Sequence, residues 1–207
     1  MFRLTEMLRE LRDATPHSPS EDGRLQRPMG PRRDPPGPVV IWNLIRRCNL
    51  KCKHCYSISA DVDFPGELTT EEVFSVMDDL KRFRVPALIL SGGEPLLRPD
   101  IFDISRRAKS MRFYTALSSN GALIDEEAAD RIAEIGYDYV GVSLDGIGET
   151  HDRFRGQAGS FDAALAGVRA CVARGVKVGL RFTMTLDNYR ELPRVIELAE
   201  AEGVSKF

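Results

Sequence analysis

Three cysteine thiols lie within one short stretch of the sequence and are the side chains best suited to chemistry. Cys48, Cys52 and Cys55 have the spacing CxxxCxxC. Four cysteines scattered at random would give this spacing in roughly one of two thousand chains, so chance is a poor explanation. Three thiolates in one loop can hold three irons of a cubane cluster and leave the fourth iron open to a small molecule. Cys171 lies far away in a segment with a helical pattern, where we predict a buried thiol.

Structural zinc is the alternative metal for this loop. Zinc of that kind favours four protein ligands, and His54 is the nearby side chain that could complete the set. Because His54 lies inside the same tight loop, it is poorly placed to bind zinc together with both flanking cysteines. On this alternative the loop would be a structural metal clip on an interaction domain, and the purified protein would be colourless.

Polar segments that contain glycine follow three of the predicted strands. Residues 91–95 read Ser-Gly-Gly-Glu-Pro, residues 118–121 read Ser-Ser-Asn-Gly, and residues 143–146 read Ser-Leu-Asp-Gly. Two adjacent glycines let a backbone approach a ligand closely, so that main-chain groups can meet an anion or an amine. Each segment alone is typical of an ordinary turn. Because all three follow strands of one predicted sheet, we expect them to line the same rim as the cysteine loop.

Short apolar runs alternate with longer helical patterns after residue 38, and these elements must position the candidate residues. We predict strands over residues 39–44, 87–90, 113–117, 139–143 and 176–183. We predict helices from residue 69 and over residues 99–109, 125–135, 161–174 and 191–202, the first with a capping box and the third ended by Gly136. Five strand–helix units in series predict an α/β fold, with a parallel sheet and helices outside it. Residues 204–207 look like the start of a sixth strand, so we expect a chain truncated after its fifth βα unit.

The composition restricts the function classes. Hydrophobic residues make up 43% and charged residues 29%, with a net charge of −2, whereas a nucleic-acid-binding surface would need a basic excess. No apolar run approaches the roughly 20 residues of a membrane span, so we expect a cytoplasmic protein that binds neither membrane nor nucleic acid. We predict an amphipathic helix in residues 1–15, a flexible proline-rich linker in residues 16–38 and a core domain in residues 39–207.

Taken together, the cysteine spacing and the three rim segments resemble the radical S-adenosylmethionine (SAM) superfamily, over essentially all of residues 39–207. The resemblance implies a partial (βα)6 barrel with a 4Fe–4S cluster on Cys48, Cys52 and Cys55. SAM would bind the open iron through its amino and carboxylate groups. An electron from the cluster would then break an S–C bond of SAM, giving methionine and a 5′-deoxyadenosyl radical that abstracts a substrate hydrogen.

The resemblance also implies roles for residues on the rim. The segment that contains Gly92, Gly93 and Glu94 resembles the motif that meets the amino group of the SAM methionine. Asn120 and Ser143 resemble contacts to the SAM ribose or its surroundings. All of these are therefore expected to bind the cofactor.

Two further cofactor contacts are implied. Arg155, in a segment expected to be a loop, is placed like the arginine that pairs with the SAM carboxylate in the subgroup with C-terminal cluster-binding extensions. A guanidinium suits a carboxylate in both geometry and charge, and the alternative is a charge exposed on a surface loop. His54 occupies the position before the last cysteine, which is usually Tyr or Phe near the adenine. Histidine can also stack there.

Longer runs resemble one branch of the superfamily, the radical SAM enzymes of haem d1 biosynthesis. They are residues 39–57, 59–64, 91–98 and 150–155. That branch is understood to act on propionate side chains of didecarboxysirohaem, on the way to the haem d1 of a denitrification nitrite reductase. The resemblance therefore implies a tetrapyrrole substrate, a reducing electron donor such as flavodoxin or ferredoxin, and a second iron–sulfur cluster in a C-terminal segment outside this chain. Related haem-pathway decarboxylases and peptide-modifying enzymes share the barrel and are the alternatives.

Overall fold

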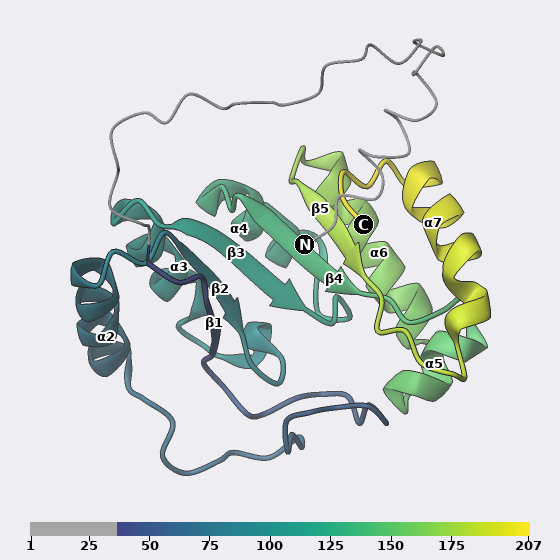
Figure 1. Ribbon diagram of the computed structural model, residues 1–207, viewed down its shortest axis with the longest axis horizontal. Coiled ribbons are helices and arrows are strands. Elements are labelled where there is room, and N and C mark those ends of the chain that lie inside the picture. The colour runs from purple at the N-terminus through teal and green to yellow at the C-terminus, as the bar shows by residue number, and fades with distance from the viewer. Residues whose placement is uncertain (1–36) are drawn as a thin grey trace, which may run out of the picture.

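The computed structural model describes residues 37–207, which form one parallel sheet with helices packed against it (Figure 1). The helix predicted in residues 1–15 and nearly all of the linker predicted in residues 16–38 lie outside the described residues. Within residues 37–207, no helix combines the length and the apolar character that crossing a membrane would require.

The sheet contains five strands in chain order, each paired in parallel with the next. They are β1 (Val40–Asn43), β2 (Ala87–Ser91), β3 (Tyr114–Ser119), β4 (Tyr139–Ser143) and β5 (Val178–Arg181). Parallel neighbours need a crossover connection, and here helices supply it, which confirms the predicted α/β topology. An isolated parallel bridge joins Gly179 to Lys206, so the segment predicted to begin a sixth strand lies beside β5.

Within residues 37–207, six helices and two short 3-10 turns connect or follow the strands. They are α2 (Thr70–Arg82), η1 (Pro95–Leu97), α3 (Ile101–Ser110), α4 (Glu126–Ile135), α5 (Glu149–Arg155), α6 (Ser160–Ala173), η2 (Tyr189–Glu191) and α7 (Leu192–Ala201). The capping box predicted for α2 is present, because the Thr69 hydroxyl accepts from the Glu72 N–H and the Glu72 carboxylate accepts from the Thr69 N–H. Gly136 ends α4 with a φ of 67°, as predicted.

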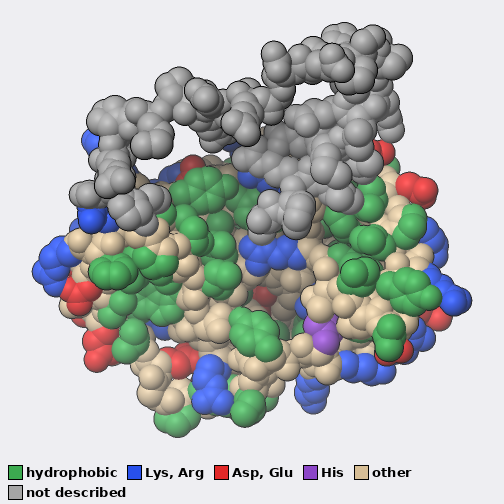
Figure 2. Space-filling model, in the orientation of Figure 1, with side chains coloured by type: hydrophobic (Ala, Val, Ile, Leu, Met, Phe, Trp, Pro, Cys, Tyr) green, Lys and Arg blue, Asp and Glu red, His purple; other side chains and the backbone are tan. Residues whose placement is uncertain are grey.

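The hydrophobic core lies between one face of the sheet and the helices. Alternate side chains of the strands, such as Leu88 and Leu90 in β2 and Val140 and Val142 in β4, are fully buried in it. The opposite face of the sheet carries polar side chains such as Ser118 and Ser143, and Ile41 of β1 is exposed there. Figure 2 shows a hollow near the middle of the molecule, with hydrophobic and cationic side chains around it.

Two local predictions were wrong. The segment containing Arg155 was expected to be a loop, but it forms the helix α5 between Gly148 and Gly156. Such a short helix has too few turns to show a clear apolar period in the sequence. The third strand was predicted to end at residue 117 but continues through Ser118 and Ser119, because both pair with β4. The polar rim therefore begins inside the strand.

Candidate functional site

A pocket of about 300 Å³ opens at the carboxyl ends of the strands, beside the loop that follows β1. This is the end at which α/β sheets bind ligands. Of the residues predicted for the site, all except Glu94 line the pocket: Cys48, Cys52, His54, Cys55, Gly92, Gly93, Asn120, Ser143 and Arg155. The structure therefore gathers side chains and backbone from five separate stretches of sequence around one cavity.

The cysteine loop is held by the end of α5. The Lys51 and Lys53 N–H groups donate to the carbonyl oxygens of Arg155 and Phe154, at 3.1 and 2.9 Å. Gly156 follows the helix with a φ of 70°, and a Cβ there would lie 2.6 Å from the Lys51 carbonyl oxygen. Only glycine permits both this φ and this approach. Carbonyl groups left free at the helix end therefore fix the backbone around the second cysteine.

The three thiols differ in exposure but surround the same pocket. Cys48 is buried, Cys52 is half-buried and Cys55 is exposed. Burial raises the pKa of the Cys48 thiol. Asn120 Nδ2 lies 4.0 Å from Cys48 Sγ, and Arg155 Nη1 lies 3.5 Å from Cys52 Sγ. Because N–H groups directed at sulfur stabilise thiolate ligands and tune iron–sulfur clusters, these residues fit a cluster held by three thiolates.

The glycine pair runs along the segment that leads into the cysteine loop. The Gly93 N–H donates to the Ile45 carbonyl oxygen at 2.6 Å. A Cβ on Gly92 would lie 2.4 Å from that oxygen, and a Cβ on Gly93 would lie 2.3 Å from the Arg47 carbonyl oxygen. Any larger residue would push the two segments apart. The glycines therefore position the loop in addition to lining the pocket.

Glu94 does not line the pocket and is fully buried. Its carboxylate accepts hydrogen bonds from the Ser119 hydroxyl at 2.9 Å and from the Asn120 and Leu96 N–H groups at 2.8 and 3.1 Å. Burial raises the pKa of Glu94 to about 7, and these hydrogen bonds oppose that rise. The structure thus uses Glu94 to hold the turn after β3 and does not bring it into the pocket beside the other predicted residues.

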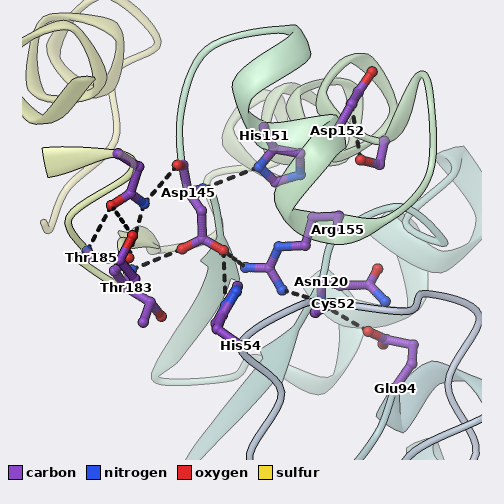
Figure 3. Close-up of polar contacts among 12 residues, drawn as sticks. Cys52, His54, Glu94, Asn120, Asp145, His151, Asp152, Arg155, Thr183 and Thr185 are labelled. Atoms are coloured by element: carbon purple, nitrogen blue, oxygen red, sulfur yellow. Dashed lines mark hydrogen bonds and ion pairs between the residues drawn. The ribbon is translucent and has the colours of Figure 1, made fainter. Parts of the chain in front are cut away.

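Arg155 lies at the centre of a buried ionic group (Figure 3). Its Nη2 is 2.6 Å from Asp145 Oδ2, and His54 Nε2 is 3.2 Å from the same oxygen. The Arg155 side chain is 9% exposed and that of Asp145 is 0% exposed, so the alternative of a solvated surface charge is wrong. Within the described residues the buried Arg155 Nε has no hydrogen-bond partner.

Asp145 is a site residue that the sequence did not single out. Its Oδ1 accepts from the Thr183 N–H at 2.8 Å, and its N–H donates to His151 Nδ1 at 3.1 Å. Asn188 Nδ2 also donates to the Asp145 carbonyl oxygen at 3.0 Å. Burial lowers the pKa of His151 to about 4, so this imidazole is neutral at pH 7. In the sequence Asp145 belongs to an ordinary polar turn, and no local signal separates it from other turn aspartates.

His54 lines the pocket with its ring 5.6 Å from the ring of Phe154. Burial lowers the pKa of His54, which favours the neutral imidazole. The zinc alternative needed a His54 nitrogen beside the cysteines, whereas Nε2 faces Asp145. This orientation favours a ring contact with a bound ligand over metal binding.

Arg181 also lines the pocket and was not predicted as a site residue. It ends β5, and its Nη1 contacts the Ser118 hydroxyl of β3. To do so the side chain crosses β4 over Gly141, where a Cβ would lie 2.4 Å from Arg181 Nε. The sequence held a signal for this contact, since a glycine inside a strand often marks a close approach.

Cys171 is fully buried in α6 and does not line the pocket. Burial raises the pKa of its thiol to about 11. A neutral thiol in an apolar setting is the buried residue that the sequence predicted.

Comparisons with known proteins found a matching family model and similar enzymes. The family model for the Radical SAM superfamily matches residues 42–199. Pre-heme d1 synthase of Dinoroseobacter shibae is 55% identical over 209 residues, covering 100% of this chain and 48% of that protein. Fe-coproporphyrin III synthase of Methanosarcina barkeri is 48% identical over 170 residues, covering 82% of this chain and 43% of that protein. The chain thus spans less than half the length of these relatives.

A solved structure shares the fold. Streptococcus suis SuiB bound to S-adenosylmethionine matches with a TM-score of 0.71 at 18% sequence identity. The match covers 82% of this chain and 39% of that chain. At this low identity the likeness concerns the fold alone.

Proposed function

This chain belongs to the radical SAM superfamily, and from that premise we propose that it forms the cofactor-binding part of an enzyme that acts on a tetrapyrrole. One observation carries the proposal: Cys48, Cys52 and Cys55 line a single pocket together with the glycine pair and Arg155. A thiolate from each cysteine would hold one iron of a 4Fe–4S cluster. The chemistry supplied there would be reductive cleavage of SAM to methionine and a 5′-deoxyadenosyl radical.

The chain's own residues would prepare the pocket for that chemistry. Asn120 and Arg155 direct N–H groups at the sulfur atoms of Cys48 and Cys52, which stabilises the thiolate forms. Asp145 holds one edge of the Arg155 guanidinium at 2.6 Å, so the side chain is fixed before a ligand arrives. Such preorganisation lowers the entropy cost of binding.

The SAM contacts are assigned by the position of each group around the pocket. We assign the SAM carboxylate to Arg155, whose guanidinium matches it in shape and charge. The backbone of Gly92 and Gly93 would meet the methionine amino group. Both glycines line the pocket, and neither has a side chain that would separate its backbone from the cavity. Ser143 and Asn120 would contact the ribose.

His54 would contact the adenine, because its ring lines the pocket and its Nε2 is engaged by Asp145. Glu94 is the predicted contact that we revise. We assign it the support of Asn120 and Ser119 in place of direct contact with the methionine amino group.

The substrate we propose is a didecarboxysirohaem-like tetrapyrrole whose propionate side chains are modified, as in haem d1 biosynthesis. Support comes from the 55% identity to a protein named pre-heme d1 synthase. A related haem-pathway reaction is the second candidate, favoured by the 48% identity to an Fe-coproporphyrin III synthase. The reaction would also need a one-electron donor such as flavodoxin or ferredoxin. We assign a second iron–sulfur cluster to the part of the longer relatives that this chain does not span.

Anaerobic reconstitution with iron and sulfide, followed by incubation with SAM and dithionite, tests the proposal. We expect a brown iron–sulfur chromophore, formation of 5′-deoxyadenosine, and a change in the mass of added didecarboxysirohaem. A mass change only in Fe-coproporphyrin III would favour the second candidate. A colourless zinc protein, or a full cluster that never yields 5′-deoxyadenosine, would overturn the proposed chemistry.

A further inference from the structure

The strand side of the pocket carries a guanidinium that the proposed chemistry does not use. Arg181 lines the pocket beside Ser118 and Ser143, on the face of the sheet opposite the helices. Its Nη1 contacts the Ser118 hydroxyl, and its Nε has no hydrogen-bond partner among residues 37–207. The described part of the chain offers Arg181 no ion-pair partner, whereas Arg155 is paired with Asp145. Among the described residues that line the pocket, Arg181 is therefore a cation without a paired carboxylate.

The surrounding residues hold this guanidinium in a defined place. Gly141 lies directly beneath it, since a Cβ there would be 2.4 Å from Arg181 Nε and 2.6 Å from Cζ. Arg181 Cζ is 5.7 Å from the Tyr139 ring centroid, and Lys206 Nζ is 5.2 Å from the same centroid. Gly179 leaves room for that ring, because a Cβ there would lie 2.4 Å from the Tyr139 hydroxyl oxygen. Both cations thus lie within about 6 Å of one ring centroid, a distance at which an aromatic ring attracts a cation.

A half-buried cation without a counter-charge is unfavourable until a ligand supplies one. SAM carries one carboxylate, and the proposed function assigns it to Arg155. The Arg181 guanidinium therefore requires a different anion. Its planar fork of donors suits a carboxylate, and the proposed tetrapyrrole carries carboxylate side chains on its rim.

We propose that Arg181 binds a carboxylate side chain of the substrate and so orients the macrocycle at the pocket. This inference rests on the proposed function, because it takes the substrate to be a tetrapyrrole carboxylate. The inference depends on the position of the Arg181 guanidinium. It lies over Gly141 and near the Tyr139 ring, and it lines the same pocket as the three cysteines.

Fluorescence titration with coproporphyrin III and with its methyl ester tests the inference, because the ester keeps the macrocycle and removes the negative charges. We expect the anaerobically reconstituted protein to bind the acid more tightly than the ester. Arg181→Gln should weaken binding of the acid about 10- to 100-fold, the range for a charge-assisted hydrogen bond, and should change ester binding far less. Arg181→Lys should recover part of the loss. Arg106→Gln, on α3 at the helix side of the sheet, is the matched control and should bind like the wild type.

Gly141→Ala tests the position of the charge separately from its presence. The added methyl group would displace the Arg181 guanidinium, so binding of the acid should fall although the arginine remains. Unchanged affinity for the acid in Arg181→Gln would overturn the inference, as would equal binding of acid and ester by the wild type. An equally large loss of SAM affinity in Arg181→Gln would assign the guanidinium to SAM instead.

SAM cleavage tests the proposed function independently of the role of Arg181. Formation of 5′-deoxyadenosine by the wild type without any tetrapyrrole measures SAM cleavage alone. A protein that cleaves SAM but binds acid and ester equally keeps the proposed chemistry and loses the role of Arg181. A protein that shows the Arg181-dependent preference but never cleaves SAM keeps the carboxylate site and loses the chemistry.

Discussion

Replacing Arg155 with alanine would leave a fully buried carboxylate without its cation. Asp145 is 0% exposed, and Arg155 Nη2 lies 2.6 Å from its Oδ2. Removing one partner of a buried ion pair costs about 3–5 kcal/mol of folding free energy, because the remaining charge stays in a poorly solvated place. The Thr183 N–H still donates to Asp145 at 2.8 Å and His54 remains nearby. We therefore expect a loss of about 3 kcal/mol, at the lower end of that range.

Urea denaturation followed by circular dichroism measures this loss. The samples are the wild type, Arg155→Ala, Asp145→Asn and the double variant. We expect the double variant to lose less stability than the sum of the two single losses, by about 0.5–3 kcal/mol, because the second change removes a charge that is already unpaired. Arg153→Ala is the control: Arg153 is exposed on the same helix, so its replacement should change stability by less than about 0.5 kcal/mol.

Wild-type stability of Arg155→Ala, or additive losses in the two single variants, would refute a stabilising pair between Arg155 and Asp145. The same variant should bind SAM more weakly by about 1.5–3 kcal/mol, measured by calorimetric titration under anaerobic conditions. Arg155 also donates to Cys52 Sγ at 3.5 Å, so iron is assayed in every sample. A loss of SAM affinity at full iron content would then belong to the arginine and not to the cluster.

The remaining predictions concern the proposed iron ligands, a buried histidine and a crowded glycine. Cys52→Ala should lose the iron–sulfur absorbance, whereas Cys171→Ala should keep its iron, and the reverse result would exchange their roles. Burial lowers the pKa of His151 from 6.5 to about 4, so the wild type should lose stability as pH falls from about 6.5 toward 4, because the unfolded chain takes up the proton first. In urea titrations, His151→Gln should reduce the change in unfolding free energy between about pH 6.5 and 4. An unchanged profile would show that His151 does not cause the loss of stability. Gly93→Ala should prevent cluster loading, because its Cβ would lie 2.3 Å from the Arg47 carbonyl oxygen, and normal iron content would contradict this.

Much of the fold could be predicted from the sequence because its signals are local. The capping box at Thr69 and the glycine at 136 mark helix ends through contacts between residues close in sequence. Apolar runs located all five strands, and their alternation with helices predicted parallel pairing. The cysteine spacing predicted which three thiols would surround one pocket, since all three lie in a single loop.

Only the tertiary structure decided what surrounds those thiols. Asp145 is paired with Arg155 because α5 folds back over the turn after β4, and nothing in the sequence shows that closure. Glu94 is buried because the turn after β3 supplies the donors for its carboxylate. Arg181 reaches Ser118 because the register places Gly141 between them. Local pattern specifies the elements, whereas these pairs join residues of different elements and depend on the register and packing that the assembled sheet imposes.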